Sequence, residues 1–243
     1  MVASVTPVLS QSPEPREVEY SALASESPMT RLWFALVATA CATLASAQAP
    51  HTHQHGFSGA EHWARVFDDP ARDAWQKPHE VVQALKLAPD AAVADIGAGT
   101  GYFAVRLAHM TANGRVYAVD IEPDMVKYLG ERAQKSGLKN LIAVQGAPDD
   151  PKLPAKVDLV LMVDVYHHID GRDAYFRKLA GSLKPGGAVA IIDFTKESPV
   201  GPPPSSRIAA SEVKAEMQRA GYVLATEHGF LPNQYFLVFR PRQ

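Results

Sequence analysis

The feature that most constrains this chain is a set of three glycines, spaced two apart, at the end of an apolar run. These glycines are Gly97, Gly99 and Gly101. A chain that turns sharply from a strand into a helix while its backbone approaches a ligand needs residues without side chains. A second apolar run, 115–119, ends in the single acid Asp120. Because an acid at the tip of a neighbouring parallel strand can accept hydrogen bonds from ribose hydroxyls, the pair predicts a nucleoside-binding site.

The glycine spacing argues against a dinucleotide as the ligand. Nicotinamide and flavin folds use a G-x-G-x-x-G pattern, in which the helix start holds a pyrophosphate. Here Tyr102 occupies the position of the last glycine. The acid Asp95, inside the first apolar run, also suits a ligand with a cationic amino-acid end better than one with phosphates. The run 95–101 resembles the first motif of the class I S-adenosylmethionine-dependent methyltransferases.

Later segments follow in the order that this family has. Segment 157–169 has the composition of a buried parallel strand that runs into a loop, and it resembles the fourth strand of the family. Residues 183–187 place proline and glycine ahead of the apolar run 188–193, which resembles the turn before the fifth strand. The runs 222–227 and 234–240 lie a short loop apart and must form an antiparallel hairpin, as at the end of this family's sheet.

Strands and helices alternate along the rest of the chain. The pattern predicts a third strand at 141–145, a helix at 171–183 and a helix at 211–220 capped by Ser211. We therefore expect an α/β fold with a doubly wound, mostly parallel seven-stranded sheet that ends in an antiparallel hairpin. Two amphipathic helices are predicted between Gly59 and Lys86. They are interpreted either as a lid over the cofactor cleft or as plain packing against the sheet.

The resemblance implies S-adenosylmethionine as the cofactor, with Asp120 on its ribose and with Ile121 and Met125 on either side of its adenine. The family usually places an acid directly after the glycine that follows the third strand, whereas Ala147 follows Gly146 here. Asp149 or Asp150 is expected to take over that contact. The cofactor-binding residues implied are Asp95, Gly97, Ala98, Gly99, Thr100, Gly101, Tyr102, Asp120, Ile121, Met125, Asp149 and Asp164.

The implied activity is methyl transfer to an unidentified small-molecule acceptor. Such an in-line displacement depends mainly on alignment, and a base is needed only where the acceptor carries a proton. The catalytic candidates are Asp164, Tyr166 and His167, and the alternative for His167 and His168 is packing within the following turn. Weaker candidates near the acceptor are Asp193, Phe194, Lys196, Arg207, His228 and Tyr235. An exported protein that binds S-adenosylmethionine or a nucleoside without turnover is the alternative function.

Composition agrees with one globular domain and gives no sign of nucleic-acid binding. Hydrophobic residues make up 47% of the 243 residues, and the formal net charge is −2. Lysine and arginine are scattered among acids rather than gathered in a stripe. We expect a small-molecule acceptor, no nucleic-acid partner and no metal in the catalytic site, and the sequence does not indicate an oligomeric state.

The N-terminal region has the pattern of a secretory signal peptide at residues 29–47. A basic residue precedes an apolar stretch that is too short to span a bilayer, and a small-x-small ending follows at 45–47. We expect residues 1–28 to be a non-native upstream extension, 48–60 a histidine-rich flexible linker and 61–243 the methyltransferase-like domain. The protein is then periplasmic or secreted, without stable membrane insertion after cleavage.

Two features of this region leave alternatives open. Cys41 is the only cysteine of the chain, and a lipid anchor on it is a minor alternative to cleavage after Ala47. His51, His53 and His55 alternate along the linker. They are interpreted as part of a polar linker, with metal binding as the alternative.

Overall fold

The computed structural model describes residues 59–242. Their centre is a seven-stranded sheet with the order β3-β2-β1-β4-β5-β7-β6. The strands are β1 (Ala92–Ile96), β2 (Arg115–Asp120), β3 (Leu141–Gln145), β4 (Val157–Val163), β5 (Leu183–Phe194), β6 (Tyr222–His228) and β7 (Gln234–Pro241). Strands β1 to β5 pair in parallel, and β7 runs antiparallel to both β5 and β6. The predicted seven-stranded α/β fold is therefore confirmed.

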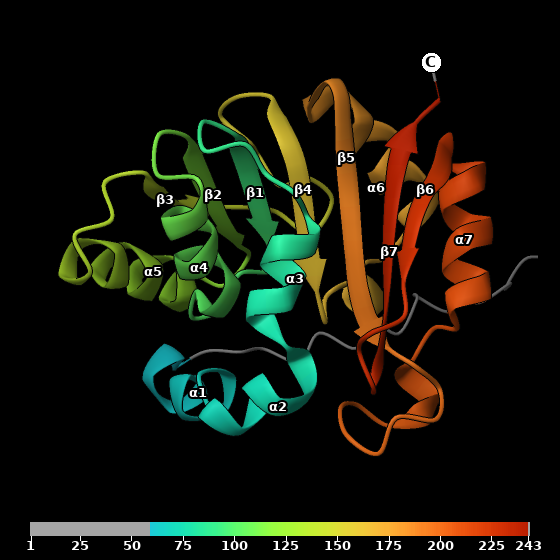
Figure 1. Cartoon of the computed structure of the whole chain (residues 1–243), viewed down its shortest axis with the longest axis horizontal. Coiled ribbons are helices and arrows are strands. Elements are labelled where there is room, and N and C mark those ends of the chain that lie inside the picture. Colours follow the sequence, from blue (N-terminus) through green and yellow to red (C-terminus); the bar gives the residue numbers. More distant parts are fainter. Residues whose placement is uncertain (1–58, 243) are drawn as a thin grey trace, which may run out of the picture. The chain divides into compact units, whose positions relative to one another are not determined.

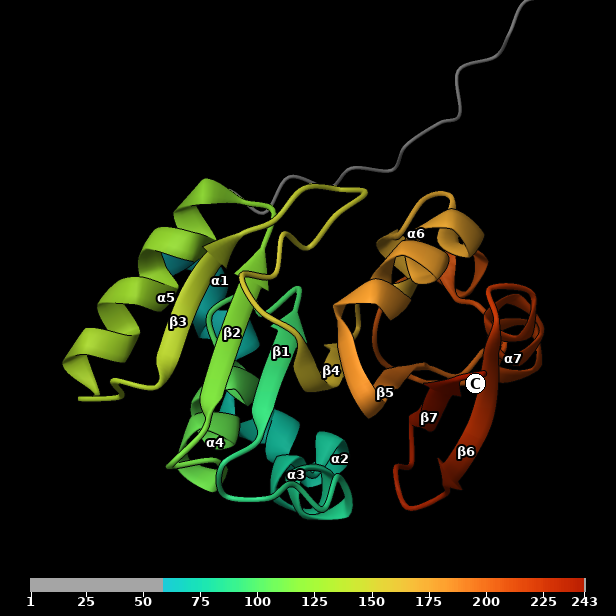
Figure 2. The same ribbon diagram turned by 90° about the horizontal axis from the view of Figure 1, so that it is seen from above.

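Helices cover both faces of this sheet (Figures 1 and 2). They are α1 (Ala60–Phe67), α2 (Asp73–Gln76), α3 (Pro78–Ala84), α4 (Tyr102–Met110), α5 (Pro123–Lys135), α6 (Arg172–Leu179) and α7 (Ala210–Arg219). Helices α3, α4 and α5 pack through residues such as Leu107 and Leu129 on one face. Helices α6 and α7 pack through Phe176 and Met217 on the other. Because side chains alternate along a strand, β1 contributes Val93 to the first core and the neighbouring Ala94 to the second.

Residues 59–77, which we call the cover segment, lie beyond the carboxyl ends of β1 and β4 (Figure 1). Asp68 forms an ion pair with Arg132 at 2.8 Å, and the Lys77 ammonium donates to the Phe230 carbonyl at 3.1 Å. The N-terminal helices are interpreted either as a lid or as packing against the sheet, and each interpretation fits a different part of this region. The cover segment lies over the strand ends, where a lid is expected, and α3 packs on the sheet face.

Element boundaries differ from the sequence-based expectation at several places. The helix expected over 171–183 ends at Leu179, and three α-helices, not two, lie between residues 59 and 86. Strand β5 begins at Leu183, which pairs with Val157, so residues 184–187 lie within the strand and not in a turn ahead of it. Helix α7 begins at Ala210 after Ala209, and no side chain caps it, so the prediction of a Ser211 cap is wrong. Among residues 59–242, no helix is both long and apolar enough to cross a membrane.

Candidate active site

The glycine bend connects β1 to α4. All three of its glycines have φ between +54° and +93°, a backbone conformation that residues with side chains rarely adopt. The Gly97 amide donates to the Val119 carbonyl at 2.8 Å, which ties the bend to β2. A Cβ atom on Gly97 would lie 2.3 Å from a methyl carbon of Val165, so space as well as conformation requires glycine there.

Asp120 lies beside this bend at the carboxyl end of β2. Its Oδ2 accepts a hydrogen bond from the Gly99 amide at 2.8 Å, and its Oδ1 accepts one from the Glu122 amide at 3.0 Å. Burial raises the pKa of the Asp120 carboxyl, and these two amides oppose that shift. The sequence places these residues on different strands, and the structure brings them into direct contact.

Two buried polar atoms near the bend lack a hydrogen-bond partner within the described part of the chain: Asp95 Oδ2 and Thr100 Oγ1. Asp95 is 3% exposed. Burial, followed by the nearby charge of Asp120, raises the pKa of Asp95 to about 7, and the Ala104 amide opposes that shift. Since buried polar groups normally have partners, these atoms fit a ligand that presents a cationic or hydrogen-bonding end. The residues present thus suit the amino-acid end and the ribose of S-adenosylmethionine.

The residues expected around the adenine lie near Asp120 with different exposures. Ile121 is 47% exposed, whereas Met125 is 1% exposed in α5. Asp149 is exposed in the turn after β3, and the Gly146 amide of that turn donates to the Asp120 carbonyl at 2.9 Å. Ile121 and the turn at 146–150 therefore border the same side of the site as Asp120.

Tyr102 contacts the cover segment through its side chain. Its hydroxyl donates to Asp73 of the cover segment. The guanidinium groups of Arg72 and Arg106 lie 4.4 and 4.1 Å from the centre of its ring. The ring is buried, so the side chain of Tyr102 fastens the cover segment to α4.

The cover segment reaches the glycine bend itself. A Cβ atom on Gly99 would lie 3.3 Å from the Phe67 ring. The Arg132 guanidinium, which pairs with Asp68, also donates to the Thr100 carbonyl at 2.7 Å. The side chain of Phe67 therefore fills part of the space beside the bend, and a ligand that enters there must displace the cover segment.

Asp164 lies at the carboxyl end of β4, where it joins the cover segment to the hairpin. It accepts hydrogen bonds from the Gln76 amide at 3.0 Å and from the Gln234 amide. Arg72 lies 3.8 Å from its Oδ2. Burial and the neighbouring charge of Asp193 raise the pKa of Asp164. Sequence reasoning missed Gln76 and Gln234, because nothing in an isolated glutamine indicates which distant carboxylate it meets.

His167 forms a dyad with Asp193 of β5. Its Nδ1 lies 2.9 and 3.0 Å from the two carboxylate oxygens, and its backbone amide donates to Oδ2 at 3.3 Å. Both side chains are buried, at 6% and 2% exposed. Because a carboxylate only accepts, Nδ1 carries the proton in the neutral form of the ring, and Nε2 then has a lone pair. This arrangement orients an imidazole that can accept a proton at Nε2.

The prediction that Tyr166 is catalytic is not supported by the geometry. The side chain is completely buried, and its hydroxyl donates to Glu216 at 2.6 Å. Glu216 also binds the Arg172 guanidinium at 2.6 Å. Tyr166 therefore joins the turn after β4 to α6 and α7, away from the carboxylate of Asp164.

Of the weaker acceptor candidates, two lie close to the His167–Asp193 dyad. The ring of Phe194 lies 5.8 Å from that of Trp75 in the cover segment. The Tyr235 hydroxyl is buried without a hydrogen-bond partner within residues 59–242, and Asp193 is among the charges that act on it. Lys196 instead donates to the Pro204 and Arg207 carbonyls.

Arg207 organises the loop after β5. The residue is 6% exposed. Its guanidinium donates to five carbonyls at 2.6–3.4 Å, those of Thr195, Lys196, Ser198, Val200 and Pro202. Arg207→Ala leaves these acceptors without their donor, so we expect a loss of about 2–4 kcal/mol in the free energy of unfolding. The melting temperature should fall by roughly 5–15 °C. Arg115→Ala, at an exposed position, is the control, and an unchanged melting temperature for Arg207→Ala would contradict this role.

Residues 59–242 contain no group of three side chains placed to hold a metal ion. The histidines at 51, 53 and 55 lie outside the described residues, as do Cys41 and the segments 1–28 and 29–47. The interpretations of these segments stay predictions.

Comparisons with known proteins agree with this geometry. Residues 93–187 match a family described as "Methyltransferase domain". The chain is 32% identical over 115 residues to protein-L-isoaspartate O-methyltransferase of Aeropyrum pernix, an alignment that covers 46% of this chain and 42% of that protein. The chain thus spans less than half the length of this curated relative.

Two solved structures share the fold. A SAM dependent methyltransferase from Aquifex aeolicus is 27% identical, with a TM-score of 0.69 over 74% of this chain and 97% of that one. Magnesium protoporphyrin IX methyltransferase (ChlM) from Synechocystis PCC 6803, with bound SAH, is 18% identical, with a TM-score of 0.60 over 77% and 95% of the two chains.

The described residues form a domain with the class I methyltransferase fold. The fold shared with the Aquifex structure and the match of residues 93–187 agree with S-adenosylmethionine as the cofactor, which the resemblance in the sequence implies.

Proposed function

We propose that this chain transfers the methyl group of S-adenosylmethionine to a small-molecule acceptor. The observation that carries the proposal is the contact between Asp120 and the glycine bend, with the unpartnered atoms of Asp95 and Thr100 beside it. When bound, S-adenosylmethionine supplies a sulfonium methyl group that is already activated for displacement. Asp120 is then the acceptor for the ribose hydroxyls, and Asp95 faces the cationic amino-acid end.

The His167–Asp193 dyad favours an enzyme over a binding protein without turnover. Asp193 holds the imidazole through Nδ1, so Nε2 can take a proton from a hydroxyl or N–H group of the acceptor as that atom attacks the methyl group. The aligned distance between the reacting atoms supplies most of the rate enhancement. The dyad adds to that rate only for acceptors that must lose a proton.

The position of the cover segment supports a small acceptor. Trp75 of this segment packs against Phe194 at the end of β5, next to Asp193 of the dyad. An acceptor that reaches His167 therefore lies beneath residues 59–77, with aromatic side chains beside it. This arrangement suits a compact, partly apolar molecule better than a folded protein or a nucleic acid.

Calorimetry on the full chain tests the proposal directly. S-adenosylmethionine and S-adenosylhomocysteine should both bind, and methyl-labelled cofactor should transfer label to an acceptor in a pool of phenols, catechols and quinols. The absence of binding by either nucleoside at millimolar concentration contradicts the cofactor assignment. Binding of both without any labelled acceptor favours the protein without turnover.

Cofactor affinity should depend on pH through Asp95. Its pKa of about 7 keeps much of the carboxyl protonated at neutral pH, and a cationic ligand binds better to the ionised form. Affinity should therefore rise between about pH 6 and 8, with proton release on binding that calorimetry in two buffers measures. Asp95→Asn should remove this dependence. A pH profile that is equally steep in Asp95→Asn would assign it to another group.

The same raised pKa makes the folded state bind more protons than the unfolded chain between about pH 4 and 7. This contribution to stability is present below the unfolded pKa and is lost as pH rises through about 7. Thermal unfolding of Asp95→Asn should accordingly gain stability relative to the native chain as pH rises.

We also propose that the chain is exported through the signal peptide at 29–47, with a mature form that begins near residue 48. The support is the sequence pattern alone. Mass spectrometry of the N-terminal peptide from native cells tests it. A peptide from within residues 2–16 would contradict the proposed cleavage.

A further inference from the structure

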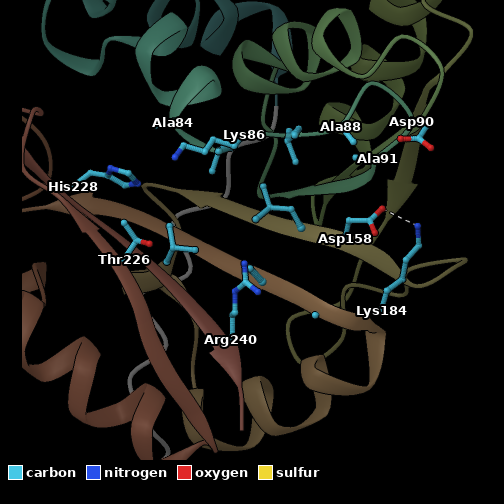
Figure 3. Close-up of a pocket in the computed structure, with 16 residues that line it drawn as sticks. Ala84, Lys86, Ala88, Asp90, Ala91, Asp158, Lys184, Thr226, His228 and Arg240 are labelled. Atoms are coloured by element: carbon cyan, nitrogen blue, oxygen red, sulfur yellow. Dashed lines mark hydrogen bonds and ion pairs between the residues drawn. The ribbon is translucent and has the colours of Figure 1, made fainter. Parts of the chain in front are cut away.

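A hollow of about 460 Å³ lies along the α3-side face of the sheet, from the amino ends of the parallel strands to His228 at the end of β6 (Figure 3). It is bordered by residues at or just before the amino ends of three strands: Asp90 and Ala91 ahead of β1, Asp158 in β4 and Lys184 in β5. The glycine bend and the His167–Asp193 dyad lie at the carboxyl ends. None of these active-site residues lines the hollow.

The floor of this hollow is apolar. Leu159 and Ala188 belong to the core on the α3 side of the sheet, and Val238 packs against that core. The end of α3 forms one wall, with Ala84 and Leu85. No helix of the described residues lies in front of β5 and β7 at this place (Figure 1). An uncovered sheet face with an apolar floor is favourable for binding an apolar ligand. The volume of the hollow also falls in the range of small-molecule sites.

Two cationic side chains, Lys86 and Arg240, and the imidazole of His228 line the hollow toward β6 and β7. Lys86 and His228 lie close together on one side and Arg240 lies across from them (Figure 3). Burial and the charge of Lys86 both lower the pKa of His228, which places the two groups in one electrostatic environment.

The acids at the rim do not balance this charge. Asp158 is paired with Lys184 at 2.7 Å (Figure 3). That pair leaves Asp90, at the far end of the hollow in Figure 3, as the remaining carboxylate of the lining. Near Lys86 and Arg240 the lining therefore has an excess of positive charge beside an apolar surface.

We propose that this hollow binds a small amphipathic anion, with a carboxylate or phosphate between Lys86, His228 and Arg240 and an apolar body on the floor of Leu159, Ala188 and Val238. Arginine and lysine recognise such groups through charge-assisted hydrogen bonds. The apolar floor adds the burial that an inorganic anion lacks. The positive charge of Lys86 and Arg240 disfavours a cation. The apolar floor disfavours an anion that is polar throughout.

The test uses the full chain with four eight-carbon probes: octanoate, octyl phosphate, octanol and octylammonium. Two-dimensional amide NMR should show shifts at Ala188, Thr226 and Val238 with both anions, and weaker or no shifts with octanol and octylammonium. The two anions also distinguish a carboxylate ligand from a phosphate ligand. Equal effects of octanol and octanoate, or no shift with any probe at millimolar concentration, overturn the proposal.

Variants check that the named residues form the site. Lys86→Gln and Arg240→Gln should each weaken octanoate binding about tenfold or more, since each removes a charged hydrogen bond. Thr226→Phe places a larger side chain at the exposed lining of β6 and should abolish binding without touching the core. Lys156→Gln, at an exposed loop position, is the control. Cofactor binding, measured in parallel, should be unchanged in all four variants, so failure here is distinct from failure of the proposed function.

Discussion

His167→Ala should lower kcat for methyl transfer by roughly 10²–10⁴-fold, the usual contribution of a positioned general base. The imidazole is held by Asp193 through Nδ1 at 2.9–3.0 Å, which leaves Nε2 to accept the acceptor's proton. Asp193→Asn should have a similar effect, because an amide can donate to Nδ1 and favour the wrong tautomer. The measurement is transfer of labelled methyl to the acceptor found in the labelling screen.

Three further results separate a base from a structural role. Cofactor affinity by calorimetry should be unchanged in His167→Ala, since the hydrogen bonds of this imidazole run to Asp193 and not to the glycine bend or Asp120. Added imidazole should restore part of the rate in His167→Gly. His109→Ala, at an exposed position in α4, should behave as the native chain. An undiminished kcat in His167→Ala, with an acceptor that carries a hydroxyl proton, rules the dyad out.

Asp120→Ala should weaken S-adenosylmethionine binding by about 1–3 kcal/mol, which is roughly tenfold to a hundredfold in the dissociation constant. The variant removes the acceptor for the ribose and also the carboxylate that fixes the amides of Gly99 and Glu122. Both losses act on the nucleoside, so S-adenosylhomocysteine should lose the same factor. Calorimetry with the two ligands measures it.

Asp120→Asn refines this result. The amide keeps one acceptor oxygen but loses the charge, so its affinity should fall between those of the native chain and Asp120→Ala. Asp170→Ala, an exposed acid in the turn before α6, is the control for net charge. Equal affinity in Asp120→Ala and the native chain would falsify the ribose contact.

The sequence predicted the features that rest on local pattern. Strand β3 at Leu141–Gln145 and the final hairpin have clear alternation or apolar runs, and both are present. The three glycines of the bend have positive φ angles, a conformation that favours glycine, so their positions within residues 95–101 could be recognised from the sequence alone. Asp120 could be placed because a parallel strand ends in the same register as its neighbour, and Ile96 is indeed paired with Val119.

Features that depend on register between distant strands could not be predicted. His167 meets Asp193 only because β4 pairs with β5 so that Val163 lies opposite Ile192. Neither residue carries a local signal of the other. The hydrogen bonds from Gln76 and Gln234 to Asp164 also join residues that are distant in sequence. The carbonyls that accept from Arg207 are brought together by an irregular loop, which the sequence does not predict.

The start of one helix was a further source of error, and the contacts of another were not predicted. Tyr102 begins α4 directly after the glycine bend, and its contact with the cofactor stays a prediction. Its hydroxyl reaches Asp73 in the cover segment, a partner that lies far away in sequence. Ser211 is the second residue of α7, whose N-cap position is held by Ala209, so its side chain is not at the position from which a residue caps a helix.

Residues 59–77 touch both halves of the candidate active site, with Phe67 beside Gly99 and Trp75 beside Phe194. Under the proposed function, exchange of the spent nucleoside and departure of the methylated product depend on displacement of the same stretch of polypeptide. Release of one product therefore opens the route for the other, and the rate of that opening sets an upper limit on turnover that no change at His167 can raise.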